Sequence, residues 1–127
     1  MATMLEPGGR HTVVVVDDDP DLLEALAELL EAHGYAVETA TNGAEALAKL
    51  RGLEAPCLVL LDLMMPVMNG WEFRRCQQAD DRLAKVPVVI ISADEELALH
   101  AQALSATAFL AKPVDVGRLL DMVGQHC

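Results

Sequence analysis

Near its start the chain carries the stretch VVVVDDDP, residues 13–20, in which an apolar run ends in three acids and a proline. Val favours strands, and a run without polar residues is typical of a strand that is covered on both faces. Asp before Pro often starts a helix, because Asp caps the helix and Pro fits its first turn. The stretch therefore predicts a buried strand, an acidic strand end, and a helix that begins at Pro20 with Asp19 as its cap.

The same arrangement recurs along the chain. The apolar runs LVLL (58–61), VVII (88–91) and FLA (109–111) are each followed by one polar residue, Asp62, Ser92 or Lys112. Strand patterns alternate with helix patterns, which is typical of βα units on a parallel sheet. We expect five strands and five helices in one α/β domain. The helices are predicted at 20–33, 43–51, 71–79, 95–104 and 115–126. A capping box of Asn42 and Glu45 is expected to open the helix at 43–51. In the helix at 20–33, the residues expected to face the core are Leu22, Leu26, Leu29 and Leu30.

The polar strand ends predict a phosphate-handling site. Carboxyl ends of parallel strands share one edge of a sheet, so Asp17, Asp18, Asp62, Ser92 and Lys112 should meet there. Three adjacent carboxylates repel one another, and a divalent cation relieves that repulsion. Few oxygen ligands, with waters to complete an octahedron, suit Mg²⁺. A hydroxyl and an ammonium beside them can bind a phosphoryl group.

The loop after the third predicted strand is the most specific local signal. It reads DLMMPVMNG, residues 62–70, so an acid ends a buried strand and is followed by Pro66 and the pair Asn69-Gly70. Those residues favour sharp turns. We therefore expect Asp62 to be held at an accessible rim of the sheet.

Length and charge limit the classes of function. The chain has 127 residues, and we expect a short lead-in over 1–10 and one domain over 11–127. Nine basic and twenty acidic residues give a net charge of −11, which disfavours direct binding to nucleic acid. The apolar runs are too short to span a membrane. We therefore expect a cytoplasmic protein that does not insert into membranes. Its three cysteines, Cys57, Cys76 and Cys127, lack CxxC spacing and are predicted to be reduced thiols.

Four motifs in this order, VVDDDP, LLDLMMPVMNG, IISA and FLAKP, resemble the receiver domain of bacterial two-component response regulators. The resemblance spans residues 12–126. It implies a flavodoxin-like, doubly wound (βα)5 fold with a five-stranded parallel sheet in the order 2-1-3-4-5. It also implies a stand-alone signalling protein of the chemotaxis-receiver type rather than an enzyme, although such a protein assists its own phosphotransfer and slow dephosphorylation.

The resemblance assigns roles to the residues of the predicted site. Asp62 matches the phosphoacceptor, which takes its phosphoryl group from a sensor histidine kinase or a histidine phosphotransfer protein. Asp17, Asp18, Asp62 and the backbone carbonyl of Met64 match the groups around Mg²⁺. Lys112 matches the lysine that pairs with phosphate, and the bond between it and Pro113 is expected to be cis.

Ser92 and Phe109 match the switch residues that convey phosphorylation to a partner surface on the fourth helix, fifth strand and fifth helix. The downstream target is expected to be a protein, and a weak homodimer through the same surface is compatible with the resemblance. Met64 and Phe109 replace a polar residue and a Tyr that many receivers have there. The stretch from Ser92 to Phe109 is also about two residues shorter than usual.

Two other classes of protein share part of this pattern. A haloacid-dehalogenase-type phosphatase also uses an aspartyl nucleophile, Mg²⁺, a hydroxyl and a Lys, and Asp17 with Asp19 forms its Asp-x-Asp. That class leaves the motif at 62–70 unexplained and is usually longer. A pseudo-receiver would keep the fold and bind partners independently of phosphorylation.

Overall fold

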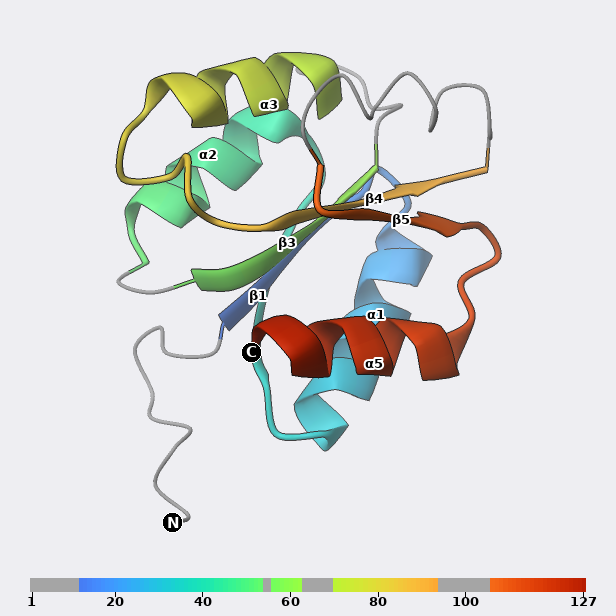
Figure 1. Ribbon diagram of the computed structural model, residues 1–127. Helices are drawn as coiled ribbons and strands as arrows, with labels where there is room; N and C mark the ends of the chain where they lie inside the picture. The colour runs from blue at the N-terminus through green and yellow to red at the C-terminus, as the bar shows by residue number, and fades with distance from the viewer. Residues whose placement is uncertain (1–11, 54–55, 63–69, 94–105) are drawn as a thin grey trace, which may run out of the picture.

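The structure is a computed structural model that describes residues 12–53, 56–62, 70–93 and 106–127. Its five strands form one parallel sheet in the order β2-β1-β3-β4-β5 (Figure 1). This is the predicted flavodoxin-like arrangement. The strands, in chain order, are β1 (Thr12–Val16), β2 (Ala36–Ala40), β3 (Pro56–Asp62), β4 (Val88–Ser92) and β5 (Ala108–Ala111).

Helices cover both faces of the sheet. Within the described residues these are α1 (Pro20–Ala32), α2 (Gly43–Arg51), α3 (Gly70–Ala79) and α5 (Val116–His126). The helix predicted at 95–104 lies outside the described residues. Helices α2 and α3 lie over one face, and α1 and α5 lie over the other (Figure 1). None of the described helices combines the length and apolar character that a membrane span needs.

Each face of the sheet carries its own apolar core, because alternate strand residues point to opposite sides. Toward α2 and α3 the core contains Val14, Val16, Ala40, Ala46, Leu47, Leu50, Val59, Leu61, Phe73, Leu83, Val86, Val88 and Ile90. Toward α1 and α5 it contains Val13, Val15, Leu23, Leu26, Leu30, Leu58, Leu60, Val89, Ile91, Leu110, Leu119 and Val123. Strands β1, β3 and β4 are buried on both sides, as their unbroken apolar runs predicted.

The predicted helix caps are present. The side chain of Asp19 accepts hydrogen bonds from the backbone N–H groups of Asp21 and Leu22, at 3.0 and 3.4 Å. At the start of α2, Asn42 accepts from the N–H of Glu45 at 2.9 Å. The Glu45 carboxylate reaches back to the N–H of Thr41, at 2.8 Å. Helix α1 ends one residue earlier than predicted, and Gly34 follows with a φ of 92°, which glycine adopts without strain.

Two expectations need correction. The α1 residues buried in the core are Leu23, Leu26 and Leu30, whereas Leu22 and Leu29 lie only partly buried at its edge. The prediction that all three cysteines are reduced is wrong, since Cys57 and Cys127 form a disulfide and only Cys76 is free. Helix α5 runs back along the sheet to the edge where β3 begins, so the fold brings together two residues that lie 70 positions apart.

Candidate functional site

Parallel topology brings the predicted polar strand ends to one edge of the sheet. Asp17 follows β1 directly, Asp62 is the last residue of β3, Ser92 is the last residue of β4, and Lys112 follows β5. The strands β1, β3, β4 and β5 are neighbours in the sheet. The edge therefore collects side chains from positions up to 95 residues apart in the sequence.

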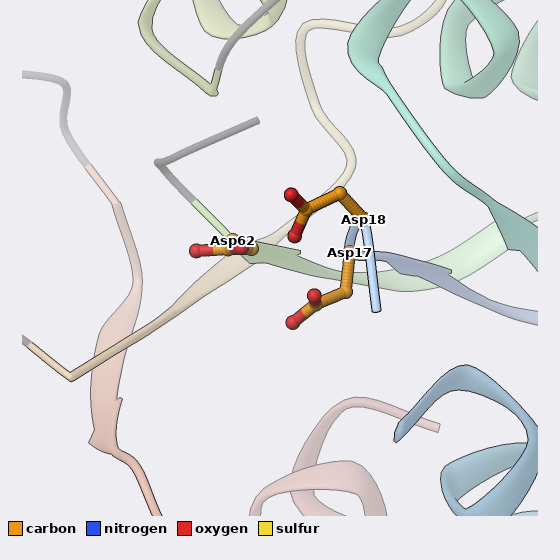
Figure 2. A group of neighbouring side chains, drawn as sticks. All are labelled: Asp17, Asp18 and Asp62. Atoms are coloured by element: carbon orange, nitrogen blue, oxygen red, sulfur yellow. The ribbon is translucent and has the colours of Figure 1, made fainter. Parts of the chain in front are cut away.

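Three carboxylates form the centre of this site. Asp17, Asp18 and Asp62 each offer one oxygen, and these oxygens all lie within 4.8 Å of one another. In Figure 2 the three side chains point toward a shared space beyond the ends of the two strands. Asp17 and Asp62 are buried, with 2% and 5% of their surface exposed, whereas Asp18 is exposed. Asp62 does end its strand at the rim of the sheet, but it is less accessible than the sequence predicted. Two negative charges are thus shielded from water beside a third, which is an arrangement that needs positive charge nearby.

Lys112 supplies part of that charge. Its Nζ donates a hydrogen bond of 2.8 Å to Oδ2 of Asp17 and lies 3.6 Å from Oδ2 of Asp62. In the structure Asp17 is the nearer partner, and Asp62 makes the longer contact of the two.

The balance of forces on Lys112 keeps it protonated. Burial disfavours its charged form and by itself lowers its pKa. The hydrogen bond to Asp17 and the charges of Asp62, Asp17 and Asp18 act in the opposite sense and prevail, so the pKa of Lys112 is raised above its ordinary value. The ammonium therefore remains a cation at neutral pH.

The backbone around the acids is also fixed by hydrogen bonds. The N–H of Asp19 donates to Oδ1 of Asp17, at 2.9 Å, so one oxygen of Asp17 holds the turn into α1 while the other holds Lys112. The N–H of Lys112 donates to the backbone carbonyl of Ser92, at 3.0 Å. The peptide bond between Lys112 and Pro113 is cis, as predicted.

The two predicted switch residues lie on β4 and β5, the two strands beyond β3 in the sheet. Ser92 is buried, with 3% of its surface exposed, and Asp62 pairs in register with its neighbour Ile91. Phe109 pairs with Ile90 and is half-buried against the core on the α2 and α3 side. Ser92 therefore lies on the strand next to that of Asp62, whereas Phe109 lies one strand further along the sheet.

The donor set fits a hard divalent cation. Carboxylate oxygens are the ligands that Mg²⁺ prefers, and few of them are needed because waters complete its octahedron. Histidine and cysteine, which softer metals would favour, are absent from this cluster of described residues. Met64, the fourth predicted ligand, lies outside the described residues, as does the segment 94–105 that follows the β4 edge.

Comparisons with known proteins agree with this geometry. A family model described as the response regulator receiver domain matches residues 13–124. The chain is 33% identical to Protein PilH of Pseudomonas aeruginosa over 113 residues, which cover 87% of this chain and 93% of PilH. It is 30% identical to the polar-differentiation response regulator DivK of Brucella anthropi over 120 residues, covering 91% and 94% of the two chains. By contrast, it spans about a third (35%) of the transcriptional regulatory protein CpxR homolog of Haemophilus influenzae.

Solved structures show the same fold. The chemotaxis response regulator CheY4 of Vibrio cholerae superposes with a TM-score of 0.82 at 30% identity, covering 91% of this chain and 98% of that one. A response regulator receiver protein from Pseudomonas putida gives a TM-score of 0.83 at 32% identity, with 90% and 95% coverage. Receiver domains are signalling domains that act with histidine kinases or phosphotransfer partners. Because the family model covers nearly the whole chain and the polar residues at the ends of β1, β3, β4 and β5 stand at one edge of the sheet, this protein belongs to the receiver domain family of two-component response regulators.

Proposed function

We propose that this receiver accepts a phosphoryl group on Asp62, in a Mg²⁺-dependent reaction, from a sensor histidine kinase or a histidine phosphotransfer protein in the cytoplasm. The observation that carries the proposal is the position of the Asp62 carboxylate. It ends β3 within 4.8 Å of two other carboxylate oxygens and 3.6 Å from the ammonium of Lys112. That combination offers a nucleophile together with groups that can balance the charge of a phosphoryl group.

The transfer itself needs little from the protein beyond position and charge. A carboxylate oxygen of Asp62 attacks phosphorus, the bond between phosphorus and the imidazole nitrogen of the donor breaks, and its electron pair returns to the imidazole. The product is an acyl phosphate on Asp62. Burial of that side chain would limit its motion and so help to position the attacking oxygen for in-line approach.

Lys112 acts on the charge of the new group. Its ammonium has three donors, of which one is used by Asp17. The contact of 3.6 Å to Asp62 is close enough for the ammonium to turn from the carboxylate to a phosphoryl oxygen once Asp62 is modified. The raised pKa of Lys112 keeps the cation available for this step.

Asp17, Asp18 and Asp62 would hold the Mg²⁺, with the backbone carbonyl of Met64 as a further ligand. When bound, the ion supplies positive charge that offsets the three acids and the phosphoryl oxygens. Asp18, the exposed member, is the side chain that solvent and an entering ion reach first.

Phosphorylation would be read out by protein binding. Ser92 ends the strand beside Asp62, and Phe109 lies on the next strand, so both can respond to a new charged group at Asp62. The differential contacts of that group with Ser92 and Lys112 would bias the surface around β5 and α5 between two conformations. We propose that a target protein, rather than nucleic acid, recognises the phosphorylated form.

The test is phosphoryl uptake from acetyl phosphate, measured by intact-protein mass spectrometry with and without Mg²⁺. The expected result is one phosphoryl group per chain with Mg²⁺ and a large loss of uptake without it. Asp62→Asn should abolish uptake, because it removes the nucleophile and keeps the shape. Asp121→Asn, an exposed Asp of α5 outside the acid cluster, is the matched control and should be modified normally.

The same assay separates the alternatives. Continuous turnover of a phosphate monoester, with no stable phosphoprotein, would identify a phosphatase of the haloacid-dehalogenase type. No uptake under any condition by a protein that nevertheless binds a partner would identify a pseudo-receiver. Uptake that persists in Asp62→Asn would show that another residue is the acceptor.

A further inference from the structure

The disulfide between Cys57 and Cys127 lies at the opposite end of the sheet from the acidic site. Cys57 is the second residue of β3, and Cys127 directly follows α5. Their Cα atoms are 5.4 Å apart, within the range that a disulfide requires. Figure 1 shows the end of α5 beside the edge where the strands begin. The bond therefore ties the last turn of α5 to the base of the strand that carries Asp62.

A bulge in β3 directs Cys57 toward α5. The β1–β3 register passes from Thr12 opposite Pro56 to Val13 opposite Leu58, so Cys57 is an extra residue in β3. Simple alternation would place Cys57 with Val59, on the face covered by α2 and α3. It packs instead with the core under α1 and α5, the same core that Cys127 contacts. The backbone irregularity is thus what makes the two sulfurs meet.

The reduced form of Cys57 also has a polar partner within reach. Its Sγ lies 3.4 Å from the backbone carbonyl oxygen of Thr12. A disulfide sulfur carries no proton, but a free thiol at this position can donate a hydrogen bond to that oxygen. Cys57 and Cys127 are each only half-buried, so a small thiol or disulfide can approach them.

Helix α5 depends on its two ends for its position. It has 11 residues, which is short for a helix to be stable alone. Its buried anchors are Leu119 and Val123. At its start, Asp115 accepts a hydrogen bond from the N–H of Arg118, at 3.2 Å, and this cap follows closely after Lys112 of the acidic site. At its other end the disulfide is the covalent anchor. Loss of that bond leaves the turn after Val123 held by weaker contacts.

We propose that Cys57 and Cys127 form a reversible redox switch, in which the disulfide pins the last turn of α5 to β3 and reduction releases it. The fully buried residues of both apolar cores include neither cysteine, and Cys57 and Cys127 only pack against the edge of one core, so we expect the fold to survive reduction. The inference goes beyond phosphorylation and rests on the proposed function only for the cytoplasmic location, where disulfides are mostly transient or redox-sensing.

The oxidant is a low-molecular-weight disulfide. The thiolate of Cys127 attacks one of its sulfurs, forming a mixed disulfide and releasing one thiolate. The thiolate of Cys57 then attacks the sulfur of Cys127, so that the protein disulfide forms and the second small thiolate leaves. Two protons from the protein thiols end on the two small thiols. Reduction is the same sequence in reverse.

The first experiment measures the redox equilibrium of the folded protein, with Cys76→Ser as the background so that only the pair is counted. The protein is equilibrated with mixtures of reduced and oxidised glutathione, and free thiols are blocked with a maleimide and counted by mass. We expect two thiols to appear and disappear together, with unchanged far-ultraviolet circular dichroism. A pair that stays reduced in oxidised glutathione, or stays oxidised in dithiothreitol, would overturn the proposal.

The second experiment measures the effect on α5 by amide hydrogen exchange. Reduction should speed exchange at least several-fold in the turn after Val123, with little change in α1 or β1. Cys57→Ser should match the reduced protein, and its melting temperature should be lower by on the order of 10 °C, because a loop of about 70 residues is no longer closed. Equal exchange in α5 in both redox states would contradict the release step.

Neither measurement requires a phosphoryl donor. Failure of Asp62 to take up phosphoryl while the thiol pair interconverts would reject the proposed function and leave the switch intact. Normal uptake with an unresponsive disulfide would reject the switch alone.

Discussion

Lys112 donates a hydrogen bond of 2.8 Å to Asp17, a residue that lies 95 positions earlier in the chain. The Asp17 side chain is 3% exposed and that of Lys112 is 25% exposed, so the pair is largely shielded from solvent. A buried charge that loses its partner is costly, because it can be compensated neither by water nor by the protein.

Lys112→Met should therefore destabilise the metal-free protein by roughly 1–3 kcal/mol in the free energy of unfolding. It removes the ammonium while keeping most of the apolar side chain. Urea unfolding in the presence of a chelator measures the loss, and a double-mutant cycle with Asp17→Asn isolates the pair. A variant as stable as the unmodified protein would show that Lys112 does not contribute to folding stability and serves only to bind phosphate. Added Mg²⁺ should recover part of the loss.

Mg²⁺ should raise the melting temperature, because an ion that binds only the folded acid cluster stabilises it by mass action. Asp18→Ala should abolish this shift. Without metal the same variant should be as stable as the unmodified protein or more so, since one of three repelling charges is gone and the side chain is exposed. Differential scanning fluorimetry over a range of Mg²⁺ concentrations reads both effects.

Asp19→Ala is the matched control for that experiment. Asp19 caps α1 and is not part of the acid cluster. Its loss should cost about 1 kcal/mol of stability and leave the Mg²⁺-induced shift unchanged. The reverse pattern, with the shift retained in Asp18→Ala, would remove Asp18 from the metal site.

Gln77 is a buried polar residue of α3 whose side chain hydrogen-bonds to the backbone of the segment between α3 and β4. It is fully buried, and its Nε2 donates to the backbone carbonyls of Leu83 and Val86, at 2.9 and 3.1 Å. Its Oε1 accepts a hydrogen bond of 2.8 Å from Arg74, which is also buried. Gln77→Met keeps the volume but leaves these groups without that partner.

Gln77→Met should lower the free energy of unfolding by about 2–4 kcal/mol, because it removes three buried hydrogen bonds at once. Chemical denaturation is the measurement, and Gln125→Met, an exposed position on α5, should change stability by less than about 0.5 kcal/mol. Equal effects of the two substitutions would mean that the hydrogen bonds of Gln77 contribute nothing net.

The lifetime of the phosphorylated form should depend on Met64, a prediction drawn from the sequence alone. In receivers the residue two positions beyond the acceptor flanks the path of the hydrolytic water. An apolar Met cannot orient that water by hydrogen bonding. Met64→Asn should therefore speed dephosphorylation several-fold without changing uptake at saturating donor. A decay time course by mass spectrometry after donor removal tests this, and an equal or slower decay would contradict it.

The strands, the caps and the membership of the acidic site follow from the sequence, because they depend on local chemistry. Short continuous apolar runs rich in Val and Ile that alternate with helix patterns favour buried strands of a parallel sheet, and parallel strands bring their carboxyl ends to one edge. Asp19 and Asn42 cap the helices through N–H groups two to three residues away. Such interactions are set by sequence neighbours and so can be predicted from them.

The remaining features needed the tertiary structure, because they depend on distances between segments that the sequence separates. Which acid holds Lys112, how deeply Gln77 is buried, and which leucines of α1 reach the core are all decided by packing. The pairing of Cys57 with Cys127 is the clearest case. It requires α5 to return to the base of β3 and a one-residue bulge to turn Cys57 toward it. No spacing motif records that geometry, since a single inserted residue in a strand changes the face on which a side chain lies.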